Sequence, residues 1–178
     1  MKLQWSHCVL RVRDLDAMLE FYRDILGFQI SDRGPLGPEG PEIVFLTTAS
    51  TDHHQLALAA TRDASEASSL DHVAFRVPSI AEVRSIFEVV SDDDRVSRVA
   101  PVTHGNAISV YFSDPEENSI EIFCDSPWHV AQPQIRGWDP RLTDEEVLAS
   151  VREAFSDQPE FGPMDRYRAQ AAKELKAK

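Results

Sequence analysis

Two histidines and one glutamate stand where a protein could hold a metal ion. His7 lies in the run WSHCVLRV and His72 in LDHVAFRV, each near the start of an apolar segment typical of a β-strand. Glu121 lies in SIEIFCD, a further strand-like run. Two imidazoles and one carboxylate make a facial triad, which leaves three positions open on octahedral Fe(II), enough for a bidentate substrate and O2. These residue types favour a non-haem iron site.

Strand alternation predicts where the three side chains point. Neighbouring residues of a strand face opposite sides of the sheet, so Ile120 and Ile122 would pack on a helix while Glu121 faces the other, concave side with His72. Burying a carboxylate is costly unless a cation or hydrogen bonds compensate it. The alternative is an edge strand with Glu121 in water and histidines that bond to their neighbours.

The elements that must position these residues occur twice. Residues 5–25 align with residues 70–90 at a constant offset of 65, which places His7 on His72. The agreement continues into an apolar stripe of helical period. In it Leu15, Met18, Phe21 and Tyr22 match Ile80, Val83, Ile86 and Phe87.

Each copy continues into three strand-like runs. These are GFQISDR, EIVFLTT and HHQLALA in the first copy, and VSRVAPV, AISVYFS and SIEIFCD in the second. Gly, Pro, Asp and Asn separate them, as in GPLGPEGPE and DPEEN. The predicted fold is therefore α+β, with duplicated βαβββ modules forming a cupped mixed sheet and a helical C-terminal extension.

The chain divides into two predicted parts. Residues 1–125 form the duplicated domain, with modules at about 3–60 and 68–125, and residues 126–178 form a C-terminal arm. In the arm, Thr143 and Glu146 match a capping box that opens the helix EEVLASVREAF, and a second helix covers MDRYRAQAAKELKA. We expect the arm to wrap the modules or a neighbouring subunit.

Composition excludes several classes of function. A net charge of −12 disfavours nucleic acid, whose phosphates need a basic surface. No apolar run reaches the roughly 20 residues of a membrane span, and the start MKLQWSHCVL does not resemble a signal peptide. Cys8 and Cys124 lie in strand-like runs without CxxC spacing, as reduced core residues do. We expect a cytoplasmic protein that binds neither membranes nor nucleic acid.

The residues resemble a known family. The repeated βαβββ unit, with SHCVLRV, LDHVAFRV and YFSDPEENSIEIF, is similar over about residues 3–125 to the vicinal oxygen chelate superfamily of glyoxalase I, methylmalonyl-CoA epimerase and type I extradiol dioxygenases. The resemblance implies that His7, His72 and Glu121 are the metal ligands.

Within this superfamily, DHHQLALA resembles the type I extradiol ring-cleaving dioxygenases. Their H-H-x-L-A stretch carries the acid–base histidine, which falls here on His54. These enzymes also place a tyrosine ten residues before the ligand glutamate, here Tyr111, and a further active-site histidine is echoed by His104. The loop around His104 is shorter than in those enzymes. The alternatives are a surface histidine for His54, a core aromatic for Tyr111 and a turn residue for His104.

The resemblance implies cleavage of a catechol-type ring next to its vicinal diol by O2, with Fe(II) as cofactor; Mn(II) suits the same ligands. His54 would relay a proton, and Tyr111 would hydrogen-bond the substrate. The substrate's ring substituents are not specified by the residues. A homodimer or higher homo-oligomer is expected.

Two other functions stay open. A glyoxalase- or epimerase-type isomerase would take a fourth ligand from the last strand of the first copy, where Gln55 could serve. Because neighbours on a strand face opposite ways, His54 and Gln55 should not both point at the metal. A non-catalytic small-molecule binding protein of the same fold is the other alternative.

Overall fold

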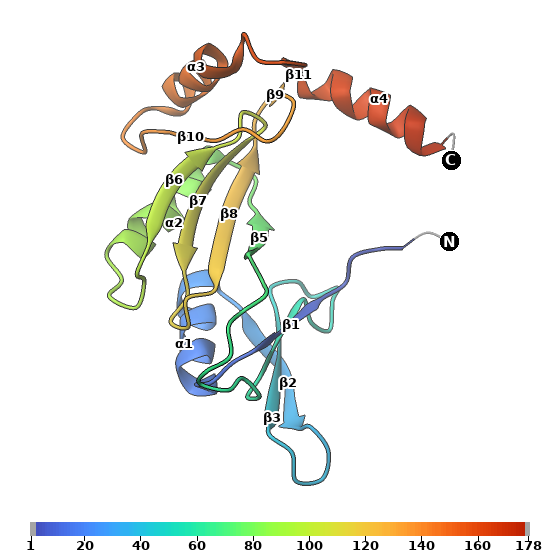
Figure 1. Cartoon of the computed structure of the whole chain (residues 1–178), viewed down its shortest axis with the longest axis vertical. Helices are drawn as coiled ribbons and strands as arrows, with labels where there is room; N and C mark the ends of the chain where they lie inside the picture. The colour runs from blue at the N-terminus through green and yellow to red at the C-terminus, as the bar shows by residue number, and fades with distance from the viewer. Residues whose placement is uncertain (1–2, 177–178) are drawn as a thin grey trace. The chain divides into compact units, whose positions relative to one another are not determined.

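The computed structural model describes residues 3–176 (Figure 1). The chain forms two compact units, each described by itself. The first runs to Asp71 and also includes Asp114–Asn118, and the second comprises His72–Ser113 and the chain from Ser119 onward. None of the helices in this described part is long and apolar enough to cross a membrane.

The first unit carries one βαβββ module. Its elements are β1 (Cys8–Arg11), α1 (Leu15–Leu26), β2 (Gln29–Pro35), β3 (Glu42–Thr47) and β4 (Leu56–Ala59). The four strands form one sheet in the order β1-β4-β3-β2. The β1–β4 pair is parallel and the other two pairs are antiparallel, so the sheet is mixed.

Helix α1 forms where the sequence supplies both ends and an apolar face. The side chain of Asp14 accepts a hydrogen bond from the Ala17 amide at the N-terminus, and Gly27 ends the helix at φ 69°, the left-handed conformation that glycine adopts without strain. Met18 and Tyr22 are fully buried. The apolar stripe that the repeat predicted is therefore the face that α1 buries in the core.

The second unit repeats the module. Its elements are β5 (His72–Arg76), α2 (Ile80–Ser91), β6 (Val99–Thr103), β7 (Ala107–Ser113) and β8 (Ser119–Asp125). With β10 (Arg136–Gly137) these strands form a five-stranded sheet in the order β10-β6-β7-β8-β5, in which β5 and β8 pair in parallel and the other pairs are antiparallel. The predicted fold class, with its duplicated βαβββ modules, is confirmed.

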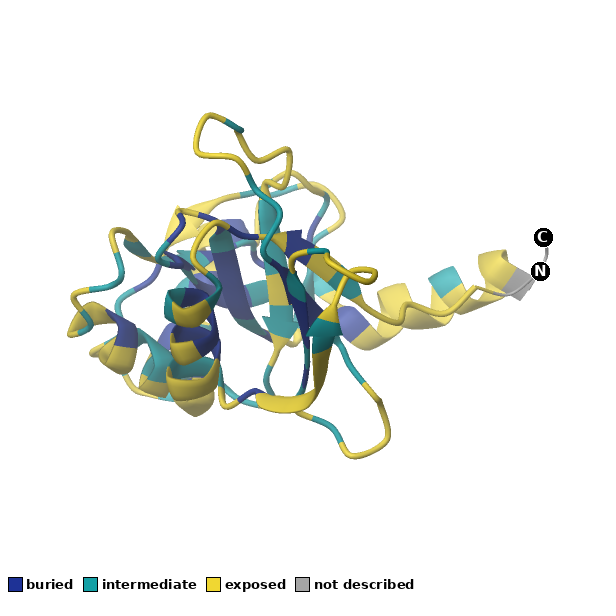
Figure 2. Cartoon of the chain, turned by 90° about the horizontal axis from the view of Figure 1, so that it is seen from below, coloured by how far each residue is buried: buried dark blue, intermediate teal, exposed yellow. Residues whose placement is uncertain are grey.

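The C-terminal arm packs within the second unit. Its elements are β9 (Trp128–His129), β10 (Arg136–Gly137), α3 (Asp144–Phe155), β11 (Gly162–Pro163) and α4 (Met164–Lys176). The capping box of Thr143 and Glu146 is present at the start of α3. Helix α3 buries one face, including Phe155. Helix α4, which leads to the C-terminus, is exposed along most of its length (Figure 2).

The DPEEN segment forms a buried polar turn in the first unit. The carboxylate of Asp114 accepts hydrogen bonds from the Glu116 and Asn118 amides and from the Tyr22 hydroxyl. Glu116 accepts bonds from the amides at the start of α1, including that of Asp14. Burial raises the pKa of Asp114, and the hydrogen bonds oppose that shift. The buried carboxylates of Asp114 and Glu116 therefore both accept hydrogen bonds.

One predicted element is shorter than expected. The run HHQLALA was expected to be a strand throughout, but β4 begins only at Leu56. His53, His54 and Gln55 precede it in irregular backbone. The alternation that should separate His54 from Gln55 is therefore not imposed by strand geometry, and their directions have to be read from their contacts.

Candidate active site

Strand register collects polar side chains on one face of the second unit's sheet. Glu121 on β8 lies directly opposite Ala74 on β5 and Tyr111 on β7, and His72 is two residues before Ala74. Residues opposite one another in a sheet share a face. Ile120, adjacent to Glu121, is fully buried on the other face, where α2 packs on β7 and β8. His72 and Glu121 therefore face the same side, as predicted, and Tyr111 faces that side too.

Glu121 and His72 form a pair of potential metal ligands. Nε2 of His72 lies 3.4 Å from Oε2 of Glu121, and the hydroxyl of Ser109 donates to the other carboxylate oxygen at 2.6 Å. Glu121 is only 7 % exposed, so its charge needs compensation. Adjacent ligands with bonds of about 2.0–2.2 Å to one divalent ion lie about 3 Å apart, and the pair fits this spacing.

Tyr111 and His104 complete this cluster. Nε2 of His104 lies 3.0 Å from the Tyr111 hydroxyl and 3.8 Å from Oε1 of Glu121. The His72 and Tyr111 rings meet edge to face at 5.4 Å. The second unit thus brings together four of the six predicted site residues. Tyr111 is half-buried, and its hydroxyl lies beside Nε2 of His104.

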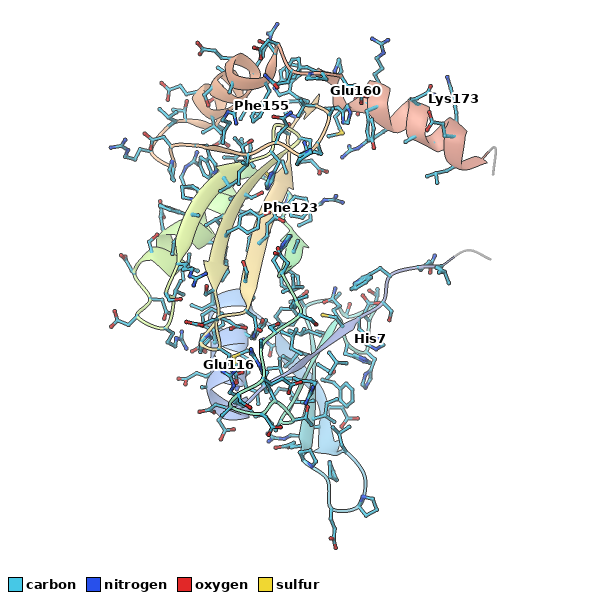
Figure 3. The ribbon with its side chains drawn as sticks, viewed as in Figure 1. His7, Glu116, Phe123, Phe155, Glu160 and Lys173 are labelled. Carbon is cyan, nitrogen blue, oxygen red and sulfur yellow. The ribbon has the colours of Figure 1, made fainter. Side chains whose placement is uncertain are left out.

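The remaining two predicted residues meet in the first unit. His7 is exposed and lies just before β1 (Figure 3), where its ring is 4.2 Å from that of His54. The His54 ring also packs against Phe45 of β3 at 4.9 Å. His54 is therefore a half-buried group beside the proposed ligand His7.

The environment of His54 favours its neutral form. Burial lowers its pKa most, and the neighbouring His7 and His53 lower it further. Nδ1 of His53 lies 2.9 Å from Nδ1 of His54, and Nε2 of His53 lies 4.0 Å from the carboxylate of Asp32. A neutral imidazole at neutral pH can accept a proton, which general base catalysis requires.

Gln55 points to a different partner. Its Oε1 accepts hydrogen bonds from the amide and the hydroxyl of Thr48, at 2.9 and 2.8 Å. This oxygen is the atom that would bind a metal, and both of its bonds would have to break first. In this unit it is His54, not Gln55, that lies beside His7.

Sequence reasoning missed two groups that support these residues. Ser109, two residues before Tyr111 on the same face of β7, could have been found from strand alternation. The main-chain carbonyl of Gln134, which lies 2.6 Å from Nδ1 of His104, has no sequence signal. It comes from an irregular part of the arm, 30 residues further along the chain.

The complete ligand set remains a prediction. His7 belongs to the first unit, whereas His72 and Glu121 belong to the second. Between residues 3 and 176, no group of three or more His, Cys, Asp or Glu side chains within a single unit is arranged to hold an ion. Each unit contributes part of the predicted donor set.

Comparison with known proteins agrees with the duplicated module. A family model described as "Glyoxalase/Bleomycin resistance protein/Dioxygenase superfamily" matches residues 4–122. A biphenyl-2,3-diol 1,2-dioxygenase 3 from Rhodococcus globerulus is 32 % identical over 127 residues, which is 68 % of this chain and 63 % of the relative. A metapyrocatechase from a Pseudomonas strain is 25 % identical over 68 % of this chain and 39 % of its own length. The chain thus spans less than two thirds of these relatives.

Solved structures share the fold. A domain of the same description from Frankia aligns with a TM-score of 0.58 at 20 % identity, covering 70 % of this chain and 99 % of that one. The fosfomycin resistance protein FosX from Listeria monocytogenes, in complex with Mn(II) and sulfate, gives 0.55 at 20 % identity, covering 70 % and 93 %. At such identities these likenesses concern the fold alone.

Proposed function

The chain belongs to the glyoxalase/bleomycin resistance protein/dioxygenase superfamily, and from that premise we propose that it is a non-haem Fe(II)-dependent extradiol dioxygenase. It would cleave a catechol-type ring next to the vicinal diol, placing both atoms of O2 in the product. The observation that carries the proposal is the cluster of His72, Glu121, Tyr111 and His104 on one sheet face. The relatives named as biphenyl-2,3-diol dioxygenases support the same class.

His7, His72 and Glu121 would hold the metal. Fe(II), when bound, supplies a Lewis acid that lowers the pKa of a catechol hydroxyl and an electron donor that makes O2 reactive. The oxygen and nitrogen donors fit Fe(II) and would also accept Mn(II). The Ser109 hydroxyl donates to one carboxylate oxygen of Glu121, and the other oxygen lies beside His72. The hydrogen bond from Ser109 therefore orients the carboxylate.

His54 would move the proton. Its lowered pKa keeps the ring neutral at neutral pH, so it can take the proton that a bound catechol hydroxyl loses and return it as the ring opens. Phe45 packs against the same ring and limits the water around it. Tyr111, held by His104, would accept a hydrogen bond from a substrate hydroxyl and so orient the ring.

The isomerase alternative has less support. It needs a fourth ligand from the segment before β4, and the Gln55 oxygen is already bonded twice to Thr48. The non-catalytic alternative predicts no bound or activating metal.

We further propose a homo-oligomer, most simply a dimer, which size-exclusion chromatography with light scattering would test.

Oxygen uptake tests the proposed activity. The full chain is reconstituted with Fe(II) without air, and then given catechol, biphenyl-2,3-diol or hydroquinone. Both vicinal diols should consume one O2 per ring and form a yellow ring-opened product, which is a semialdehyde in the case of catechol, whereas hydroquinone, whose hydroxyls cannot chelate one ion, should not react. Iron bound at one equivalent without O2 uptake with any vicinal diol would overturn the dioxygenase assignment, and no bound metal would favour a binding protein.

A further inference from the structure

The C-terminal arm reaches the cluster through His104. The Gln134 carbonyl, which can only accept, lies 2.6 Å from Nδ1 of this ring. Nδ1 must therefore carry the hydrogen, and in the neutral ring Nε2 is the acceptor. Since Nε2 lies 3.0 Å from the Tyr111 hydroxyl, that hydroxyl donates to His104. A main-chain group of the arm thus sets the direction of a hydrogen bond within the proposed site.

The side chain of Gln132 holds this arrangement at both ends. Its Nε2 donates to the carbonyl of His104 at 2.8 Å, and its Oε1 accepts from the amide of Gln134 at 3.0 Å. One planar amide therefore links the residue that carries the imidazole to the residue whose carbonyl fixes it. Only one orientation of the Gln132 side-chain amide suits these partners, because its Nε2 group can only donate and its Oε1 atom can only accept.

Neighbouring contacts tie the same part of the arm to the sheet. Strand β10 pairs with β6 in a register that sets Arg136 opposite Thr103, the residue before His104. The indole N–H of Trp138 donates to the carbonyl of Ser109, whose hydroxyl bonds Glu121. Residues 132–138 therefore run beside the two side chains that support Tyr111 and Glu121.

We infer that this arm segment is part of the site and that Gln132 is a positioning residue, which keeps the Gln134 carbonyl on His104 and holds the ring as the Nδ1–H tautomer that accepts from Tyr111. The effect on turnover rests on the proposed dioxygenase function. The tautomer does not depend on that function, so it can be measured separately.

Imidazole nitrogen shifts test the tautomer directly. The full chain, without added iron and labelled with ¹⁵N-histidine, is compared with Gln132→Met and with Gln134→Met, the matched control that loses only a side-chain bond to the Ala131 carbonyl. The signals that disappear in His104→Gln are those of the His104 ring. This ring should be the Nδ1–H tautomer in the wild type and in Gln134→Met, and a mixture of the Nδ1–H and Nε2–H tautomers in Gln132→Met. Nε2–H in the wild type, or an unchanged signal in Gln132→Met, would overturn the inference.

Two further measurements separate this role from a merely structural one. Tyr111→Phe keeps the main chain intact and should retain Nδ1–H, because the arm and not the tyrosine sets the tautomer; loss of Nδ1–H there would overturn the inference even if Gln132→Met did not fold.

With a catechol, Gln132→Met should lower kcat by about 10- to 100-fold, the range for groups that orient site residues, with KM changing less. Equal kcat losses in Gln132→Met and Gln134→Met would also contradict it. An inactive wild type with the Nδ1–H tautomer would reject the dioxygenase function alone.

Discussion

The two units hold their share of the proposed site in different ways. In the second unit Glu121 is 7 % exposed, with Ser109 on one oxygen and His72 near the other. In the first unit His7 is exposed, and its contacts are the His54 ring and the hydroxyl of Ser6. The second unit presents a buried carboxylate with assigned partners, and the first presents an exposed and a half-buried imidazole ring that contact one another.

The difference follows from where the residues lie in their strands. His72, Tyr111 and Glu121 are inside paired strands, where register fixes their neighbours. His7 and His54 stand just before β1 and β4, where no ladder constrains the backbone. Groups on regular elements are positioned more precisely than groups on irregular segments. We expect the second unit to set metal affinity and the first to tolerate movement during turnover.

The largest effect should come from removing the buried acid. Glu121→Gln keeps the shape but loses the charge, so Fe(II) affinity should fall more than about 100-fold, beyond the cost of losing a group that merely supports a ligand, and ring cleavage should vanish. Metal content after dialysis against a chelator measures this, with Glu153→Gln on α3 as the control. Full iron retention in Glu121→Gln would show that the second unit does not supply the acid ligand.

Replacing the proton-transfer group should leave metal bound. His54→Ala should lower kcat by about 10²- to 10⁴-fold, as loss of a general acid–base group does, while iron content stays near the wild type. His53→Ala, which removes only a neighbour of that ring, should cost less than about 10-fold. Normal turnover by His54→Ala would reject its acid–base role.

The pH profile tests the same histidine. Burial disfavours its charged form and lowers the pKa of His54. As pH falls, kcat should therefore hold through the usual histidine pKa of about 6.5 and decline only below it. An acid limb in wild-type kcat that begins above that value would show that another group controls turnover.

Losing support for the ligand should have a smaller effect than losing the ligand. Ser109→Ala removes the 2.6 Å bond to Glu121, and Fe(II) affinity should fall about 10- to 100-fold. Ser113→Ala, on the same strand and face, is the matched control and should stay within about threefold, below the range for an orienting group. Competition with a fluorescent chelator measures both, and equal affinities would remove Ser109 from the site.

The smallest effect is expected from two glycine substitutions, one in each unit, that test how tightly the backbone is packed. A Cβ at Gly105, where φ is +80°, would lie 2.5 Å from Cγ1 of Val130 and 3.2 Å from Cγ of Phe155. Gly105→Ala should lower the free energy of unfolding by about 1–3 kcal/mol. Gly34→Ala on β2 meets open space and should change it by less than about 1 kcal/mol. Urea unfolding measures both, and equal stabilities would show that the backbone beside His104 is not tightly packed.

Much of the site could be read from strand periodicity. Alternation in SIEIFCD placed Glu121 on the face opposite Ile120 and Ile122, and the repeat placed His72 on the same face. These predictions held because the period of a strand is local and each apolar face had one helix to pack on. The prediction of a strand over residues 53–59 was partly wrong, because the first three of these residues do not pair as a strand.

The sequence by itself determined the duplicated modules, the helix ends and the face on which each strand residue lies, because capping and periodicity act between residues a few positions apart. Only the tertiary structure decided that Gln55 bonds Thr48, that His54 meets His7, and that a carbonyl of the arm orients His104. Those contacts join irregular segments up to 47 positions apart (7 to 54), and no local pattern encodes the packing that brings such segments together.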